Sequence, residues 1–347
     1  MNNSELEGAN FIYKLTEITK NKDNLSKEDL KFIYEIDDQI LGFGYEKDPR
    51  IYQLLQYRDI KNDLSLIFEC DKSKISITPE EALSGDIIYH YGNLDLSGLQ
   101  SAEGLVLPES IGGSLNLSGL QSAEGLVLPK NISNLDLHGL QSAEGLVLPK
   151  SIGGDLDLRG LKSDKGLVLP ESIEGNLYLS RLKSAEGLVL PKNIGGDLDL
   201  RELQSAKGLV LPDSIGDYLN LSGLNSAEGL TLPKSIGRTL NLRGLQSAEG
   251  LVLPKSIGDY LNLSGLKSAE GLVLPDSISG YIDLRGLQSA KGLVLPESIG
   301  GYIDLRGLKS AKGLILPKSI GGYIDLSGLK STKDLVFPKN IRGKLVL

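Results

Sequence analysis

Reactive and metal-binding side chains are scarce in this chain of 347 residues, which contains one cysteine, two histidines and no tryptophan. The single Cys70 excludes a disulfide framework and a paired-cysteine zinc site. His90 and His138 stand far apart in the sequence, so they do not form the closely spaced pair typical of a metal-binding helix. We therefore expect no metal and no cofactor.

The chain also lacks long apolar runs and an excess of positive charge. No stretch reaches the about 20 apolar residues that a membrane-spanning helix needs, and the start, MNNSELEGANFIYKLTE, does not resemble a secretory signal. Lys and Arg number 37 against 45 Asp and Glu, whereas a nucleic-acid binder needs a basic face. We expect a cytoplasmic protein without a membrane or nucleic-acid partner; export by a route that needs no such signal would leave no trace in the sequence.

Proline, by contrast, is placed regularly. Apart from Pro49 and Pro79, the 14 prolines recur every 21 residues from Pro108 onward, with one interval of 20 residues. A fixed period in this range indicates a solenoid, in which stacked coils bury an apolar face that no coil can bury alone. The sequence therefore predicts two domains, a non-repeating one over residues 1–86 and a solenoid of about twelve coils over residues 87–347.

The first 86 residues predict a small α-helical domain. Ser4 and Ser26 can each cap an amphipathic helix, and Asp48-Pro49 and Thr78-Pro79 each place a capping residue before a proline at the first helical position. The acidic residues of this segment show no spacing typical of paired catalytic carboxylates. We expect the domain to cover the open end of the solenoid; the alternative is a separate partner-binding or dimerisation module.

Each coil contains two short segments in which leucine alternates with other residues, Leu94-x-Leu96 and Leu105-x-Leu107 in the first coil. A period of two predicts strands with both leucines pointing inward. Together with the Leu, Ala and Ile positions outside these segments, they give seven inward residues per coil. Because such a narrow column leaves no cavity, any function must lie on the outside.

Two columns of small residues predict turns. Ser101 recurs in all twelve coils without a His or Lys column beside it, so we expect the hydroxyls to bind backbone groups rather than to act as nucleophiles. Gly104 recurs in eleven coils and Asp334 takes its place in the last, which predicts positive φ at this position. The Gly98 column is interrupted by Arg181 and Glu202 and indicates a need for a small or loosely held residue.

The motif LxLxxL…GLxLPxxI over residues 94–347 resembles bacterial leucine-rich repeats of the short, LP-containing kind. The sequence departs from the general pattern LxxLxLxxNxL, because Leu99 fills the Asn/Cys position and a second LxL segment appears in each coil. These departures favour a mainly β fold, a parallel β-solenoid of about twelve 21-residue coils that is straighter than a horseshoe. The leucine-rich-repeat horseshoe implied by the resemblance is the alternative.

On the first strand of each coil, three columns point outward. The middle column is Asp or Asn in all coils but one, a Ser/Arg column follows it, and Tyr precedes it only from Tyr218 onward. Tyr and Arg are favoured at interfaces, which indicates a recognition face in the second half; the alternative is that stacked Tyr and paired Asp and Arg hold the sheet together. The candidate binding residues are Tyr260, Tyr281, Tyr302, Tyr323, Asp283, Asp304, Asp325, Arg285 and Arg306.

A further outward column, which begins at Val106, is β-branched in every coil, with Thr231 as its one polar member. β-Branched residues suit any sheet surface, but a continuous apolar stripe is also typical of a contact site.

These features predict a non-enzymatic protein-interaction or structural scaffold that binds an unidentified protein partner. The alternative is a carbohydrate-binding or polysaccharide-acting β-helix protein, since polysaccharide lyases of that fold set acids and Arg on a sheet face. Here no loop is inserted between coils to wall a cleft, and a flat, solvated face shifts pKa values little, so we expect no enzyme. The final KLVL predicts either a strand edge screened by Arg342 and Lys344 or a homodimer through the C-terminal edge.

Overall fold

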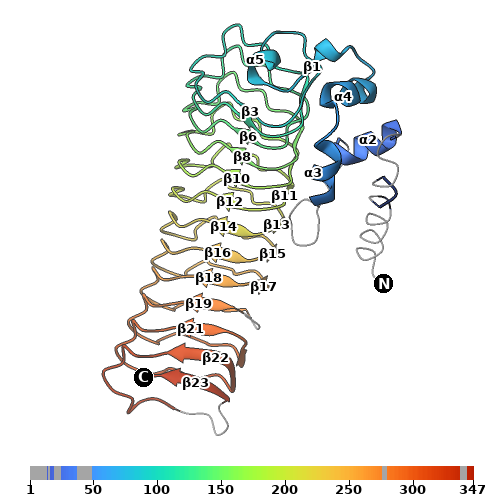
Figure 1. Cartoon of the computed structure of the whole chain (residues 1–347). Helices are drawn as coiled ribbons and strands as arrows, with labels where there is room; N and C mark the ends of the chain where they lie inside the picture. The colour runs from blue at the N-terminus through green and yellow to red at the C-terminus, as the bar shows by residue number, and fades with distance from the viewer. Residues whose placement is uncertain (1–13, 15, 19–24, 37–48, 276–279, 337–341) are drawn as a thin grey trace. The chain divides into compact units, whose positions relative to one another are not determined.

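A computed structural model describes residues 14, 16–18, 25–36, 49–275, 280–336 and 342–347 (Figure 1). The chain forms two compact units, Met1–Leu94 with Val106–Gly113 and Asp95–Leu105 with Ser114–Leu347. Among the described residues, no helix is long and apolar enough to cross a membrane.

Short helices make up much of the first unit. Ser26 begins one of them with a capping box, in which its hydroxyl accepts the N–H of Asp29 while the Asp29 carboxylate accepts the N–H of Ser26. Thr78 caps another, as the sequence predicts. The capping positions Ser4 and Asp48 lie outside the described residues. The helices are α2 (Lys27–Ile33), α3 (Pro49–Leu55), α4 (Ile60–Phe68), the 3₁₀ turn η1 (Lys72–Lys74) and α5 (Pro79–Ala82).

A small parallel sheet completes this unit. It consists of β1 (Ile75–Ser76), β2 (Tyr89–His90) and β4 (Ser110–Ile111). Apolar side chains of the helices and of β1 and β2 form one core, in which Leu64 is fully buried and the Phe68 ring stacks on Tyr89 with centroids 4.6 Å apart. The unit therefore has a hydrophobic core of its own.

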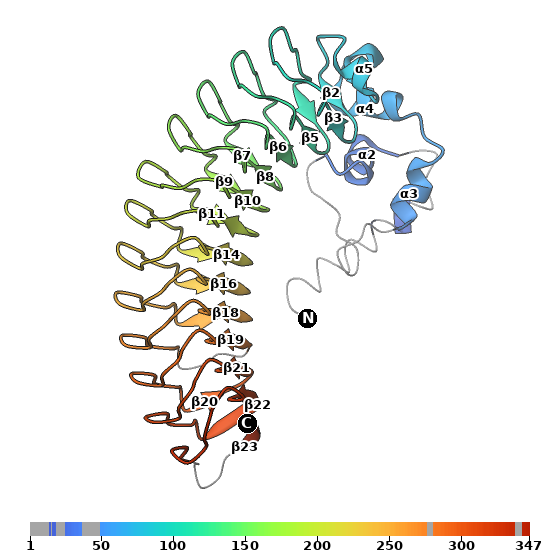
Figure 2. The same cartoon turned by 90° about the vertical axis from the view of Figure 1, so that its left-hand side faces the viewer.

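The second unit is a stack of coils whose first strands form one long parallel sheet (Figure 2). Leu177 pairs with Leu198 and Asp199 with Asn220, so each strand aligns with the equivalent residues one repeat later. We number the coils by the residues that open this column: Leu94, Leu115, Leu135, Leu156, Leu177, Leu198, Leu219, Leu240, Leu261, Ile282, Ile303 and Ile324. The strands are β3 (Leu94–Asp95), β5 (Leu115–Asn116), β6 (Leu135–Asp136), β8 (Leu156–Asp157), β10 (Leu177–Tyr178), β12 (Leu198–Asp199), β14 (Tyr218–Asn220), β16 (Thr239–Asn241), β18 (Tyr260–Asn262), β19 (Tyr281–Asp283), β21 (Tyr302–Asp304), β20 (Ser298–Ile299), β22 (Ser319–Asp325) and β23 (Arg342–Val346).

A second parallel sheet is formed by strands that directly precede the first strands of the fourth to the ninth coil in the sequence. Its six strands are β7 (Ser151–Ile152), β9 (Ser172–Ile173), β11 (Asn193–Ile194), β13 (Ser214–Ile215), β15 (Ser235–Ile236) and β17 (Ser256–Ile257). The mainly β fold, a parallel solenoid of about twelve coils with a small helical N-terminal region, is thus as the sequence predicts.

The prediction of a second strand at Leu105–Leu107, and at the equivalent residues of the other coils, is wrong. Only isolated bridges join these segments, between Val189 and Val210, Val273 and Val294, and Ile315 and Val336. Each segment runs into a proline, which has no N–H to donate to a ladder. The second set of strands instead begins at the Ser-Ile or Asn-Ile pair that follows this proline.

The interior of the coils is filled as the sequence predicts, except that the last leucine position is only half-buried in most coils, and with one addition. In the sixth coil Leu198, Leu200 and Leu203 are fully buried. Leu211, at the last leucine position, is half-buried, and the ring of Pro212 is buried beside it. The repeating proline is therefore a core residue as well as the end of a segment.

The turns also follow the sequence, with two exceptions. In every coil the serine hydroxyl accepts the backbone N–H two residues later, as Ser205 does from Lys207 at 3.2 Å. Ten of the eleven glycines in the Gly104 column have positive φ, but Gly187 and Asp334 do not, so the prediction is wrong for Asp334. A Cβ on Gly119, in the Gly98 column, would lie 2.2 Å from a carbonyl oxygen of the preceding coil, which explains the need for a small residue there.

Candidate functional site

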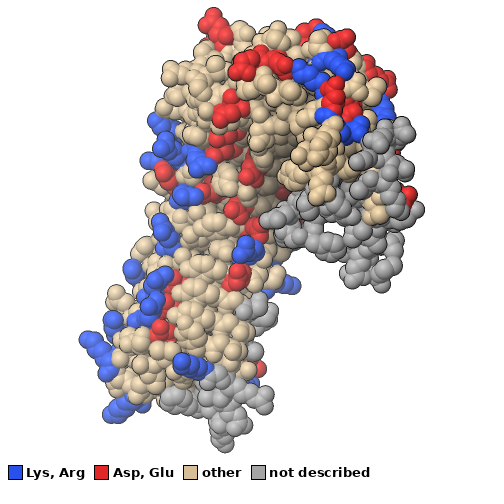
Figure 3. All heavy atoms as spheres, viewed as in Figure 1, with Lys and Arg blue, Asp and Glu red and all other residues tan. Residues whose placement is uncertain are grey.

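The nine candidate residues lie together in the second unit, on the outer side of β18, β19, β21 and β22. In-register pairing sets Tyr260 beside Tyr281 and Asp283 beside Asp304, and the two arginines follow directly after β19 and β21. We call this group of nine residues the sheet face. Figure 3 shows both acidic and basic side chains on the side of the molecule seen in Figure 1.

The four tyrosines form a continuous stack. Ring centroids are 4.8 Å apart for Tyr260 and Tyr281, 4.6 Å for Tyr281 and Tyr302, and 4.0 Å for Tyr302 and Tyr323. The first two pairs are within 7° of parallel. Each ring is partly exposed, so the stack presents ring edges to solvent and covers most ring faces.

The aspartates of the sheet face are buried, in contrast to the solvated face expected from the sequence. Asp283 and Asp304 have no exposed surface. Asp283 Oδ1 accepts the backbone N–H of Arg285 at 3.1 Å, and the carboxylate also binds the guanidinium of the same arginine. The Tyr260 hydroxyl donates to Asp283 Oδ2 at 3.4 Å, and the Tyr281 hydroxyl to Asp304 Oδ2 at 3.2 Å. Each buried carboxylate is thus saturated by its own coil and the coil before it.

This network shifts the pKa values of its members. Burial alone would raise the pKa of Asp304, but the hydrogen bonds and charge of Arg306 outweigh it and lower that pKa. Burial, followed by the charges of Asp283 and Asp304, raises the pKa of Tyr281. The side-chain hydrogen bond to Asp304 raises the pKa of Arg306. Asp304 and Arg306 therefore stay charged and Tyr281 stays neutral near pH 7.

The arginines are held in place yet remain accessible. The side chains of Arg285 and Arg306 are 51% and 48% exposed, and each is fixed by contacts to the aspartate two residues earlier. Arg306 Nε also lies 3.6 Å from Asp325 of the next coil. The sheet face thus presents ordered guanidinium groups beside a row of tyrosine edges.

In the first half of the solenoid, the column that holds tyrosine in the second half contains Asn, Ser and Asp. These side chains have a structural role that the sequence analysis did not predict. Asn134 Oδ1 accepts the N–H of Asp155 at 2.6 Å, Asp155 Oδ1 accepts the N–H of Asn176 at 2.8 Å, and Asn176 Oδ1 accepts the N–H of Asp197 at 2.6 Å. From Thr239 onward, a backbone carbonyl of the preceding coil takes over as acceptor. A side-chain ladder thus gives way to a backbone ladder covered by tyrosines. The alternation of Asn and Asp in this column was the signal that could have shown it.

One cluster of metal-ligating side chains lies elsewhere on the long sheet. Donor atoms of Asp136, His138 and Asp157 lie within 4.8 Å of one another. However, Asp136 Oδ1 already binds the N–H and Nδ1 of His138, and Asp157 binds the Arg159 guanidinium. The cluster is therefore explained by a hydrogen bond between Asp136 and His138 and an ion pair between Asp157 and Arg159.

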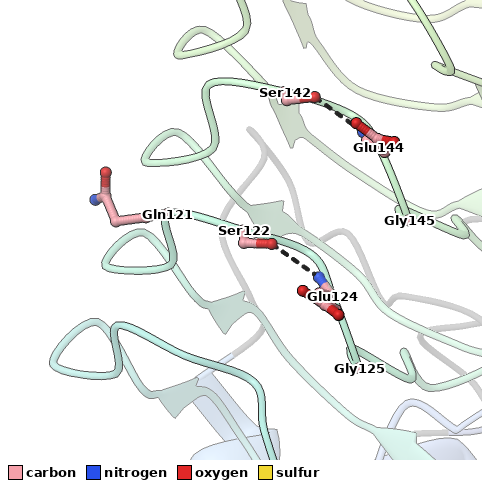
Figure 4. A pocket seen from close by; sticks show the side chains of 7 residues that line it. All are labelled: Gln121, Ser122, Glu124, Gly125, Ser142, Glu144 and Gly145. Atoms are coloured by element: carbon pink, nitrogen blue, oxygen red, sulfur yellow. Dashed lines mark hydrogen bonds between the residues drawn. The ribbon is translucent and has the colours of Figure 1, made fainter.

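A hollow between the turns of the second and third coils is also polar (Figure 4). Ser122 and Ser142 line it, but their hydroxyls already accept the N–H groups of Glu124 and Glu144. With flanking glycines and open sides, the hollow offers neither an apolar wall nor a free nucleophile.

One serine–histidine contact exists in the first unit, where Ser76 Oγ lies 2.9 Å from His90 Nδ1. Both side chains are buried to 1% exposure or less, so no substrate reaches them and the contact is structural.

No known protein family, characterised protein or solved structure matches this chain. Function must therefore be inferred from the surfaces of the coils.

Proposed function

We propose that this chain is a non-enzymatic protein-interaction scaffold and that its protein partner binds the sheet face. The proposal rests on one outward column of the first strands. Its residues differ between the two halves of the solenoid, while the core beneath it stays apolar throughout. The inward positions of the first strand hold buried Leu or Ile in all coils, whereas, among the described residues, tyrosines stack only in coils nine to twelve. Since Asn and Asp serve the same column in the first half, coil stacking does not itself require tyrosine.

The geometry favours binding because the side chains of the sheet face are already ordered in the free protein. Tyrosine stacking and aspartate hydrogen bonds fix the rings and guanidinium groups before any partner arrives, which lowers the entropy lost on association. Tyr and Arg are also the residues that most often dominate binding energy at interfaces. Each Asp–Arg pair is neutral overall, so recognition would depend on shape and hydrogen bonds more than on net charge.

The same geometry speaks against the polysaccharide alternative. A sugar ring stacks on an open aromatic face, but Tyr281 and Tyr302 each have a ring on both sides. General acid–base chemistry needs a carboxylate that can exchange a proton with substrate, and those of Asp283 and Asp304 are buried and bound by arginine. We therefore favour a protein partner.

The resemblance of the LP-containing repeats to bacterial leucine-rich repeats supports the further proposal of a bacterial protein, and the cytoplasmic location expected from the sequence also stays a proposal. A homodimer through the C-terminal edge also stays a proposal. There β23 pairs with β22 on one side.

The test is a triple change of Tyr281, Tyr302 and Tyr323 to Ser, the residue that stands in this column at Ser114. Tagged full-length protein would be used to purify partners from the native cells, well below the melting temperature. We expect the wild type to retain a partner that the triple Ser variant loses.

Two matched variants complete the design. Changing the same tyrosines to Phe keeps the ring stack, and changing Val273, Val294 and Ile315 to Ser alters exposed residues of the same coils on another surface. The valine-column control should retain the partner. Retention of the partner by the triple Tyr→Ser variant would reject the sheet face as the binding surface.

A further inference from the structure

The column of β-branched residues in the second unit forms an exposed apolar ridge. Val189 is 78% exposed, Val210 72% and Val252 76%. We define the valine ridge by its members Val127, Val147, Val168, Val189, Val210, Thr231, Val252, Val273, Val294, Ile315 and Val336. A continuous apolar stripe of this length is uncommon on a monomer's surface and often marks a contact.

Charged residues flank the ridge on both sides in each coil. We call the residue three positions before each ridge residue the leading flank, and the residue three positions after it the trailing flank. In every coil from the second to the eighth, the two flanks carry opposite charges, and all of these side chains are exposed. The pairs are Glu124 and Lys130, Glu144 and Lys150, Lys165 and Glu171, Glu186 and Lys192, Lys207 and Asp213, Glu228 and Lys234, and Glu249 and Lys255.

The charges of the two flanks change together. Where the leading flank switches from Glu to Lys, in the fourth and sixth coils, the trailing flank switches from Lys to an acidic residue. The same joint switch recurs in the tenth coil with Lys291 and Glu297, whereas the ninth coil carries acids on both flanks and the eleventh and twelfth coils carry Lys on both. The charges on the two sides of the ridge are thus coupled over the second to the eighth coil.

Contacts within one chain do not supply that coupling. The two flank residues of a coil are six residues apart, and the leading one lies in a turn closed by a backbone hydrogen bond, such as that from the Leu126 N–H to the Ala123 carbonyl. Their separation is therefore below the about 20 Å that a fully extended segment would span. Among the described residues, the ion pairs of these side chains run along a flank to the next coil, such as Lys207 with Glu186 at 3.4 Å and Lys234 with Asp213 at 2.9 Å. None crosses the ridge.

We propose that the valine ridge binds the ridge of a second copy of this chain, in parallel, around a two-fold axis that runs along the ridge. That symmetry sets each coil against the same coil of the other copy and exchanges left and right. The leading flank of one copy then faces the trailing flank of the other, and valine faces valine. Opposite charges meet at both flanks in all seven coils from the second to the eighth, and these coils form the interface; the ninth, eleventh and twelfth coils, whose flanks would bring like charges together, lie outside it.

The charges also fix the register of the two copies. A slip of one coil would bring Glu186 against Asp213 of the other copy, and Lys207 against its Lys234. Like charges at such short range oppose association and so select against the slipped pairing. The pattern thus specifies both the direction and the alignment of the pair.

The area available is at the small end for a stable interface. Seven coils at about 4.8 Å each span about 34 Å, and the strip between the flanks is less than about 20 Å wide, giving less than about 700 Å² per copy. Stable interfaces bury about 800 Å² per partner. The ridge would therefore form a small interface, in which the charges of the flanks supply the specificity.

The test is charge reversal with rescue, read by sedimentation equilibrium of the full chain. Changing Glu186, Glu228 and Glu249 to Lys sets Lys on the leading flank of one copy against Lys on the trailing flank of the other. The dissociation constant of the dimer should then rise at least about tenfold. Adding Lys192→Glu, Lys234→Glu and Lys255→Glu to the same chain restores opposite charges and should restore the dimer. Failure of the second set to restore association would overturn the proposal.

A zero-length carbodiimide cross-link identifies the alignment directly. In a mixture of ¹⁴N- and ¹⁵N-labelled copies, we expect mixed-isotope peptides that join Glu186 to Lys192 and Glu228 to Lys234. Val210→Asp, at an exposed position, should abolish these peptides while leaving the melting temperature nearly unchanged. A monomer at high concentration, or mixed-isotope peptides that join other coils, would contradict the proposal.

Discussion

The rings of Tyr281 and Tyr302 lie one above the other, with centroids 4.6 Å apart and planes 7° from parallel. This contact belongs to a stack that covers coils nine to twelve of the long sheet, while the first half carries hydrogen-bonding Asn and Asp in the same column. One position of the repeat thus has two structural solutions. Only the second presents aromatic edges beside ordered arginines.

The side-chain ladder of the first half should contribute measurably to stability. Asp155 Oδ1 accepts the N–H of Asn176 at 2.8 Å, and Asp155→Ala leaves that half-buried donor without its partner. We expect a loss of about 1 kcal/mol in the free energy of unfolding, measured by urea denaturation. Asp155→Asn keeps an acceptor oxygen and should cost little; an equal loss in both variants would contradict the ladder.

The buried aspartates of the sheet face should be more sensitive. Asp283→Ala removes the acceptor for the Arg285 N–H and the partner of its guanidinium, and we expect a loss of about 2–3 kcal/mol, because hydrogen bonds to charged groups are the stronger ones. Asp283→Asn keeps the backbone contact, as Asn262 does with Ser264 in the preceding coil, and should lose less. The comparison uses denaturation midpoints of the full chain.

A third prediction concerns pH and the first unit. Burial lowers the pKa of His90, more than its hydrogen bond to the Asn93 carbonyl raises it. The folded unit therefore favours the neutral ring, so stability is full above about pH 6.5, the ordinary value for the unfolded chain, and falls as the pH drops through the folded pKa. In a His138→Asn variant, His90 is the single histidine and its NMR titration should have a midpoint below 6.5. A midpoint at or above that value would refute the account.

Much of the fold could be predicted from the sequence because the same pattern of residues recurs in twelve coils. The proline interval gives the coil length, and the inward leucines give the core. Assignment of the second strand failed since alternation shows which way side chains point but not whether the backbone pairs. The leucines at 105 and 107 alternate as a strand does, yet the neighbouring proline cannot continue a ladder.

The sheet face was located by sequence, but its chemistry was not. The pattern Tyr-x-Asp-x-Arg places all three side chains on one side of a strand, which is why the nine residues lie together. That Asp283 would be buried could not be seen, because its cover comes from Arg285 and from Tyr260 one coil away. Helix α4 was missed although Asp59 caps it, a signal that was present in the sequence.

The central claim is that a protein partner binds the outer surface of the second half and not the equivalent surface of the first. Photo-cross-linking tests it most directly, with a benzophenone amino acid at Ser327, which follows β22, and at the matched Ser180, which follows β10. Neither serine hydroxyl takes part in a described hydrogen bond, so the fold should tolerate both changes. We expect a covalent adduct with another protein in native cells from position 327 and none from position 180; equal adducts from both positions, or none from position 327, would contradict the claim.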